Sequence, residues 1–309
     1  MNTQIKKVAF IAVALLCLTP WIQPPVALLL GFIFSLLIGH PFIKYNGKVT
    51  KMLLQISIVG LGFGMDIYEA AKTGKTGFWL TVLSIFLTLV VGLLLGYRLK
   101  VKKKTSILIS SGTAICGGSA IAAVAPIIDA NEEETSVSLA TIFILNSVAL
   151  FLFPYIGTLL ELSQQDFGLW AAIAIHDTSS VVGAAQKYGD EALQVATTVK
   201  LARALWIIPI SLLISVIFKQ QKSKIKIPYF ILLFVLAIII NTYVPIPESI
   251  TSGIVFISKK GLTLTLFFIG AGLTLKALKS VGIQPLLQGV LLWIFISVAS
   301  LYVIINRFF

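Results

Sequence analysis

The sequence predicts an all-α, polytopic membrane protein of about eleven transmembrane helices. Hydrophobic residues make up 58% of the 309-residue chain and charged residues only 12%, which leaves too little polar surface for a soluble domain. Apolar stretches close to the roughly 20 residues that a membrane-spanning helix needs recur along the whole chain, with short polar joints between them. Residues 1–309 are therefore predicted to form one integral membrane domain.

Each apolar stretch is predicted to be a helix, with ends placed to within a few residues. The predicted helices cover residues 8–22, 26–39, 50–69, 76–98, 105–129, 135–160, 169–187, 191–218, 228–243, 248–274 and 284–306. The stretch 248–274 contains Lys259, Lys260 and Gly261, and it is compatible with one long helix or two short ones.

Basic residues lie in the joints between apolar spans and not on one face with interleaved aromatics. Nucleic acid is therefore not an expected partner, despite a net charge of +12. The basic runs at 98–104 and 219–226 predict cytoplasmic loops, and the acidic joint at 132–134 is expected on the opposite side of the membrane. The predicted location is the bacterial cytoplasmic (inner) membrane. Cys17 and Cys116 lie in apolar segments without metal-ligand or disulfide spacing, and no cofactor or metal is expected.

Two internal matches predict two structurally repeated halves, about residues 1–160 and 169–309. Residues 19–24 resemble residues 242–247, and Gly62-Phe63-Gly64-Met65 aligns with Gly270-Ala271-Gly272-Leu273. A basic loop precedes the first helix of each predicted half. By the positive-inside rule this favours the same membrane orientation for the two halves, whereas many transporters have halves of opposite orientation. The relative orientation of the halves stays open.

The first polar segment runs from Ser110 to Ala120 and has Gly, Ser or Thr at seven of its eleven positions. Glycine lets the backbone leave helical geometry, and hydroxyl groups can satisfy the amides that such a break frees inside lipid. A helix broken near mid-membrane is predicted here, and the alternative is a packing face of small residues. The candidate substrate-binding residues are Ser111, Thr113, Cys116, Gly117, Gly118 and Ser119.

The second polar segment places His176 and Asp177 at the middle of an apolar span. An ionisable residue there costs at least about 2–3 kcal/mol and normally faces a cavity or a partner. A second broken helix that meets the first near mid-membrane is predicted, with His176 and Asp177 as ion-coupling residues. Thr178, Ser179 and Ser180 are assigned to substrate binding. In the alternative, Asp177 only caps the second half-helix.

Lys200 and Arg203 lie three residues apart, on one face of the next predicted helix and about ten residues beyond its start. At that depth they are predicted to supply the cationic part of an anion site, together with the positive amino ends of the half-helices. Snorkelling to the surface is the alternative. Asn146 is predicted to form an interhelical hydrogen bond and not to bind solute.

At these residues the sequence resembles the YeiH-type membrane proteins, a family associated with sulfate export and grouped with the bile-acid and arsenite type of transporters. The resemblance extends over nearly the whole chain and rests on residues 111–120 (SGTAICGGSA) and 176–184 (HDTSSVVGA). It implies a transporter whose broken helices meet at the solute site. Sulfate comes from the resemblance alone, because no residue distinguishes it from a sulfonate, a carboxylate or another small anion.

The predicted function is secondary transport of a small anion, such as sulfate or a sulfonate, by proton-coupled alternating access and without enzymatic activity. One alternative is a sodium-coupled organic-anion carrier in which Asp177 helps to bind Na⁺. An intramembrane enzyme using Ser119 or Ser179 with His176 is a second alternative. A passive channel is disfavoured because the hydroxyl groups gather at one depth. The expected partners are the solute and the lipid bilayer, and a homodimer is left open.

Overall fold

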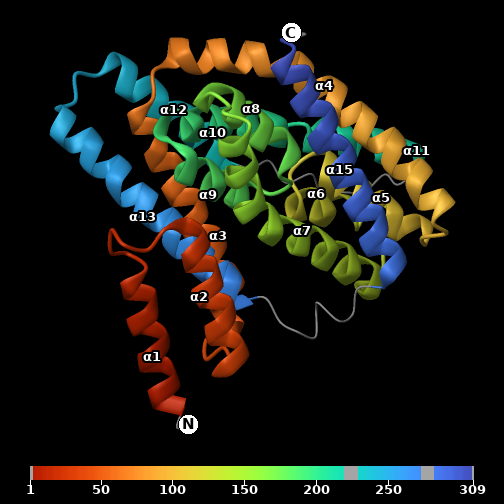
Figure 1. Ribbon diagram of the computed structural model, residues 1–309, viewed down its shortest axis with the longest axis horizontal. Helices are drawn as coiled ribbons and strands as arrows, with labels where there is room; N and C mark the ends of the chain where they lie inside the picture. The colour runs from red at the N-terminus through yellow and green to blue at the C-terminus, as the bar shows by residue number, and fades with distance from the viewer. Residues whose placement is uncertain (1–2, 219–228, 273–281, 308–309) are drawn as a thin grey trace.

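The computed structural model describes residues 3–218, 229–272 and 282–307, and every regular element in these ranges is a helix (Figure 1). The prediction of an all-α protein is confirmed. The helices are α1 (Thr3–Leu16), α2 (Pro24–Leu37), α3 (Ile43–Leu61), the 3-10 turn η1 (Gly62–Gly64), α4 (Ile67–Arg98), α5 (Lys103–Ala114), α6 (Gly118–Val124), α7 (Glu132–Leu159), α8 (Gln164–Ala174), α9 (Thr178–Tyr188), α10 (Asp190–Ala204), α11 (Ile207–Ile217), α12 (Tyr229–Tyr243), α13 (Glu248–Gly272) and α15 (Ile283–Ile305).

Within the described residues, five helical stretches are long and apolar enough to cross a membrane: 77–98 in α4, α7, the pair α10 and α11, α13, and α15. A sixth candidate joins residues 43–64 to 67–75 across a bend of 109°. The chain is thus multi-pass, with five or six spans by length and composition where the sequence predicted about eleven. The predicted segment 248–274 is one helix as far as Gly272. The basic run 219–226 lies outside the described residues.

The predicted span 105–129 does not cross the bilayer as one helix but folds back on itself. α5 and α6 lie side by side, since a Cβ on Gly112 would contact the side chain of Ile121. Lys102 Nζ, just before α5, lies 3.2 Å from Glu133 Oε1, just beyond α6. Both ends of this first hairpin (residues 103–124) therefore lie at one face of the protein. The expectation that the acidic joint lies opposite the basic run 98–104 is wrong, because a re-entrant hairpin returns the chain to the face where it entered.

The second polar segment folds back in the same way. Gln164 Oε1, at the start of α8, accepts a hydrogen bond of 3.0 Å from the backbone N–H of Glu191, which follows α9. The rings of Phe167 and Tyr188 stack with centroids 3.8 Å apart and so join the two arms at their base. Residues 164–188 form the second hairpin, in which α9 runs antiparallel to α8.

α7 sets how the two hairpins face each other. Near its start, Ser138 Oγ lies 3.4 Å from the carbonyl oxygen of Thr105 at the base of the first hairpin. Near its end, Gly157 packs against the base of the second hairpin. Between them, Asn146 donates a hydrogen bond to Asp177 at the tip of the second hairpin. The hairpins thus enter from opposite ends of α7, and their tips meet beside its middle.

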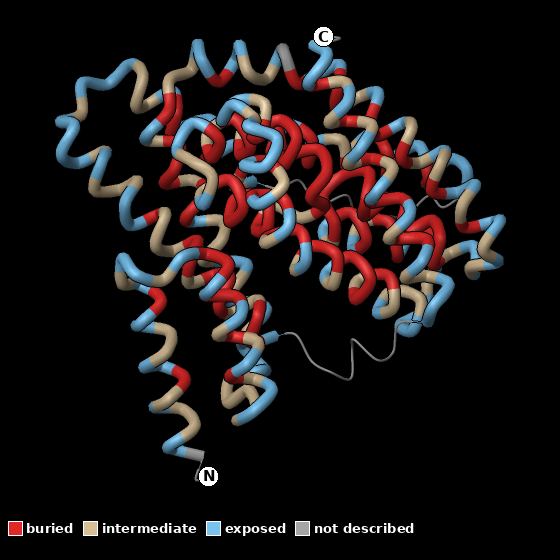
Figure 2. Tube along the Cα trace, viewed as in Figure 1, coloured by how far each residue is buried: buried red, intermediate tan, exposed pale blue. Residues whose placement is uncertain are grey.

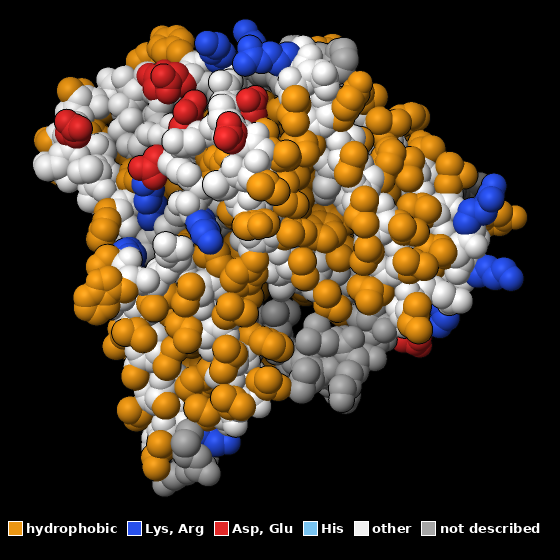
Figure 3. All heavy atoms as spheres, in the orientation of Figure 1, with side chains coloured by type: hydrophobic (Ala, Val, Ile, Leu, Met, Phe, Trp, Pro, Cys, Tyr) orange, Lys and Arg blue, Asp and Glu red, His pale blue; other side chains and the backbone are white. Residues whose placement is uncertain are grey.

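The helices form two groups. In the scaffold group (α1–α3, η1, α12 and α13), α13 packs along α2 and α3, and η1 packs against α12 and α13. In the core group (α4–α11 and α15), the long helices surround both hairpins, and buried residues concentrate there (Figure 2). The groups meet mainly where α9 packs against α13 and α2. Apolar side chains cover much of the outer surface, as lipid-facing helices require (Figure 3).

Single-cysteine labelling tests the re-entrant topology. Lys102→Cys and Glu133→Cys should react with a membrane-impermeant maleimide from the same side of the membrane, and Asp190→Cys, at the base of the second hairpin, from the other. All three native side chains are mostly exposed. The parent chain, whose Cys17 and Cys116 are buried, measures the background. Labelling of Lys102→Cys and Glu133→Cys from opposite sides would show that α5 and α6 cross the membrane.

Candidate functional site at the hairpin tips

The tip of the first hairpin is a turn that requires glycine. Gly117 has φ of +64° and ψ of −124°, a conformation that residues with a side chain rarely adopt. Its N–H donates to the carbonyl oxygen of Gly112 at 2.8 Å, which closes the end of α5. A Cβ at this position would lie 3.2 Å from Asp177 Cβ, so the tips of the two hairpins touch. The prediction of two interrupted helices that approach each other is confirmed.

The tip of the second hairpin is organised around the carboxylate of Asp177. Oδ1 accepts hydrogen bonds from Ser180 N at 2.6 Å and Ser179 Oγ at 2.8 Å. Oδ2 accepts from the amide of Asn146 and from Ser180 Oγ at 3.1 Å. Asp177 is thus the N-cap of α9, as the capping alternative predicted.

Asn146 orients this carboxylate and the peptide that precedes it. Its Oδ1 accepts from the backbone N–H of His176 at 3.1 Å, so its NH₂ group must face Asp177. That NH₂ group and the backbone N–H of Ser180 can only donate, so both oxygens of Asp177 must accept. Asn146 also forms the predicted interhelical bond, between α7 and the second hairpin.

Lys200 and Arg203 bind the carbonyl oxygens at the carboxyl-terminal ends of the entering half-helices. The last carbonyls of a helix lack intrahelical partners and carry partial negative charge. Lys200 Nζ donates to the carbonyls of Ile175 at 2.7 Å and Ala172 at 3.2 Å. Two further hydrogen bonds come from Arg203, from Nε to Ala114 O at 2.8 Å and from Nη1 to Ile173 O at 3.1 Å. Arg203 thus ties the two hairpins together.

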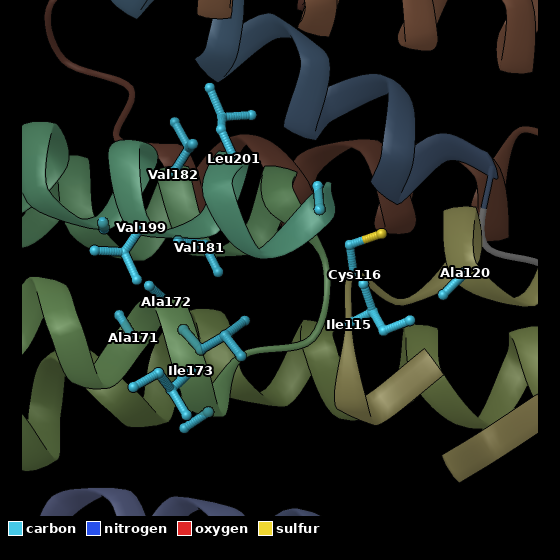
Figure 4. Packing of buried hydrophobic residues seen from close by; sticks show 14 of the residues in the cluster. Ile115, Cys116, Ala120, Ala171, Ala172, Ile173, Val181, Val182, Val199 and Leu201 are labelled. Carbon is cyan, nitrogen blue, oxygen red and sulfur yellow. The ribbon is translucent and has the colours of Figure 1, made fainter. Parts of the chain in front are cut away.

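Both cations are completely buried, which contradicts the snorkelling alternative. The two ion pairs among the described residues involve other lysines, so neither Lys200 nor Arg203 has a carboxylate within 4 Å there. Lys200, Arg203 and Asp177 together give the hairpin tips a formal charge of +1. Figure 4 shows the apolar packing of this region, with Ile115 and Cys116 at the first tip and Leu201 beside Val182. These neighbours keep water away from the charges.

The candidate residues differ in how far their side chains are exposed at the protein surface. Ser119 is exposed, and Gly118, Asp177 and Thr178 are partly exposed. The buried candidates are Ser111, Thr113, Cys116, Gly117, His176, Ser179, Ser180, Lys200 and Arg203. Within the described part of the chain, neither ring nitrogen of His176 has a hydrogen-bond partner, so neither Ser119 nor Ser179 is paired with it as a nucleophile with its base. An apolar groove of about 340 Å³ between α4 and α10 lies away from this chemistry.

Comparison with known proteins identifies the family. The profile of a family described as "Conserved hypothetical protein 698" matches residues 5–289. A UPF0324 membrane protein of Bacteroides thetaiotaomicron is 56% identical over 284 residues, which cover 91% of this chain and 86% of that protein. The chain belongs to the UPF0324 membrane protein family.

Other members of this family are similarly close. A UPF0324 membrane protein of Photobacterium profundum is 56% identical over 96% of this chain and 91% of its own length, and one of Geobacter sulfurreducens is 46% identical over 97% and 96%. No solved structure matches the chain. These names state a membrane protein and no solute, so the sulfate of the resemblance stays a prediction.

The turn at Gly117 predicts a sharp difference between two glycines. Gly117→Ala should lower the free energy of unfolding by about 1–3 kcal/mol, because the backbone conformation is strained for alanine and the added Cβ crowds Asp177. Gly74→Ala, in α4 with no atom within 4 Å of the new Cβ, is the matched control and should raise it by about 0.5–1 kcal/mol. Unfolding in mixed micelles measures both, and an equal effect at the two positions would contradict the strained tip.

A second comparison tests the role of Asn146. Asn146→Ala leaves the His176 N–H and one oxygen of Asp177 without their partner, which should cost about 1–3 kcal/mol. Ser147→Ala, on the same helix, removes only a hydroxyl bonded to its own helix and should change stability by less than about 0.5 kcal/mol. If unfolding shows no difference between the variants, Asn146 does not hold the second tip.

Proposed function

We propose that this protein is a secondary transporter of a small anion, which binds at the partly exposed face of the two hairpin tips. The observation that carries the proposal is the meeting of two hairpins from opposite faces, with two buried cations and a single carboxylate at their junction. Buried charges are costly and are retained where they serve a site. A net positive potential inside an apolar protein favours a small anion over a cation or a neutral solute.

Two kinds of group support anion binding. The amino ends of α6 and α9 lie at the tips, and helix amino ends carry partial positive charge. Ser119 and Thr178, the reachable hydroxyl residues, add hydrogen-bond donors. Lys200 and Arg203 act in this proposal through their field, since their described bonds go to helix carbonyls. Direct contact between these two cations and the solute stays a prediction.

Alternating access follows from the two groups of helices. The second hairpin packs through α9 against α13 and α2 of the scaffold group. A displacement of the core group along this contact would expose the tips first to one side of the membrane and then to the other. The positive-inside rule supports a cytoplasmic position for the basic run 98–104 at the base of the first hairpin, and we infer that the protein lies in the bacterial cytoplasmic membrane.

Proton coupling through His176 fits better than coupling through Asp177. Both oxygens of Asp177 already accept hydrogen bonds from Asn146, Ser179 and Ser180, so Na⁺ would have to displace these donors to reach the carboxylate. The ring of His176 is buried, with both nitrogens unpartnered among the described residues. Histidine is the side chain that most readily exchanges a proton near neutral pH. Sodium coupling is the alternative that the same experiment decides.

Counterflow in proteoliposomes tests transport directly. Vesicles preloaded with sulfate, taurine or a small carboxylate should accumulate the labelled form of the true solute, which a channel does not do. Arg203→Gln should weaken binding about tenfold or more by removing a buried charge. Arg203→Lys keeps the charge and should retain most of the binding with lower stability. Lys102→Gln, at an exposed ion pair, is the control and should transport normally. Unchanged binding in Arg203→Gln would refute the electrostatic role.

Imposed gradients identify the coupling ion in the same vesicles. Transport should follow a pH gradient and ignore a sodium gradient. His176→Gln should abolish that response, whereas Asp177→Asn should mainly lower stability. Sodium-driven uptake that survives in His176→Gln would exclude the proton mechanism.

A further inference from the structure

The scaffold and core groups are joined by polar contacts at the base of the second hairpin. Lys259 Nζ on α13 lies 2.6 Å from Asp190 Oδ1 at the start of α10. Gln186 Nε2 on α9 donates to the carbonyl oxygen of Lys259 at 3.3 Å. One turn further along α10, Gln194 Nε2 donates to the carbonyl oxygen of Gly64 in η1 at 3.0 Å. Three core side chains thus hold two separate elements of the scaffold.

These contacts border a small cavity between the groups. It measures about 120 Å³ and is lined from the scaffold side by Leu61, Met65 and Val255 and from the core side by Leu193 and Thr197. Asp190, Gln194 and Lys259 belong to the same lining. The cavity has room for a few water molecules, and the ion pair and Gln194 stand at its wall.

Closer to the tips the same interface becomes apolar and tight. Gly183 on α9 has no room for a side chain, because a Cβ there would lie 2.6 Å from Leu266 of α13 and 2.8 Å from Leu150 of α7. A polar layer at the base of the second hairpin and an apolar layer nearer the tips therefore separate Asp177 from the second-hairpin face, which is the side of the protein where the base of that hairpin lies. At the other tip, by contrast, Ser119 is exposed and Gly118 is partly exposed.

We propose that Asp190, Lys259, Gln186 and Gln194 form a gate that closes the solute path from the face at which the second hairpin enters. The conformation described here then opens the hairpin tips toward the first-hairpin face, the side of the basic run 98–104. This inference rests on the proposed transport function and names the contact that alternating access must break.

The chemistry of the contact suits a gate. The side chains of Asp190 and Lys259 are 78% and 25% exposed, and exposed ion pairs contribute little to stability, so the pair can separate at small cost. It is also the one ion pair within the described residues that links the two groups, since Lys102 and Glu133 both belong to the core. The attraction between the opposite charges favours the closed alignment, in which Asp190 faces Lys259, over alignments in which the two groups of helices are displaced.

Accessibility of the first tip tests the gate without requiring a solute. Ser119→Cys, at an exposed position, should react with a membrane-impermeant maleimide from the first-hairpin face and only slowly from the other. Asp190→Asn in that background should raise labelling from the second-hairpin face about twofold to fivefold. The charge swap of Asp190→Lys with Lys259→Asp should restore the slow rate. Lys260→Gln, whose lysine bonds to Thr19 within the scaffold, is the matched control and should change nothing.

A reversible crosslink gives an independent measurement on folded protein. Asp190→Cys with Lys259→Cys, joined by a bis-methanethiosulfonate reagent that spans the length of the native lysine side chain, should lose labelling from the second-hairpin face and stop counterflow, and reductant should restore both. The gate is overturned if Asp190→Asn and the crosslink leave labelling of Ser119→Cys unchanged from both faces. If labelling responds as expected while no anion shows counterflow, the gate stands and the transport proposal fails.

Discussion

The structure depends on the way in which buried cations satisfy the ends of broken helices. A helix that stops inside an apolar protein leaves carbonyl oxygens without partners, and water cannot reach them there. Lys200 and Arg203 meet this requirement with four hydrogen bonds to carbonyls of α5 and α8. Arg203 bonds to both helices and so fixes one tip against the other. Without these contacts the two turns would be too costly to keep inside the bilayer.

The amino ends of the returning arms are treated differently at the two tips. At α9 the carboxylate of Asp177 caps the helix, with Asn146 of α7 holding both the carboxylate and the preceding peptide. At α6 the residue before the helix is Gly117, and no side chain caps it. The amino end of α6 lies next to the exposed Ser119, and the backbone of Ala120 and the side chain of Ser119 both interact with the thiol of Cys116. The two turns therefore end in different ways, with a capping carboxylate before α9 and a glycine before α6.

The positions of the two helix breaks were predictable from residue types. The direction in which the chain continues after each break was not. Glycines and hydroxyl residues around Cys116, and the ionisable pair His176 and Asp177, marked both breaks because such residues have few other uses in apolar segments. Hydropathy cannot separate a span that crosses from one that returns, since both bury the same apolar length. The decisive contact, Lys102 with Glu133, joins residues 31 positions apart and has no local signature.

The spacing of Lys200 and Arg203 predicted that the two side chains share one face of a helix. It could not predict that both side chains would bind the carbonyl oxygens of other helices. The two repeated halves stay a prediction, although each hairpin is followed by a long helical stretch.

The order of these partners along the chain has a consequence for biosynthesis. The carbonyl of Ala114 emerges from the ribosome 89 residues before the guanidinium group of Arg203 that binds it. At typical rates of elongation this separation corresponds to roughly 4–18 s, during which the first tip is made but lacks its partner. A peptide end of this kind is poorly suited to lipid. The nascent first hairpin must therefore wait in the insertion machinery or at the membrane surface, and it reaches its final depth only after α10 has been synthesised.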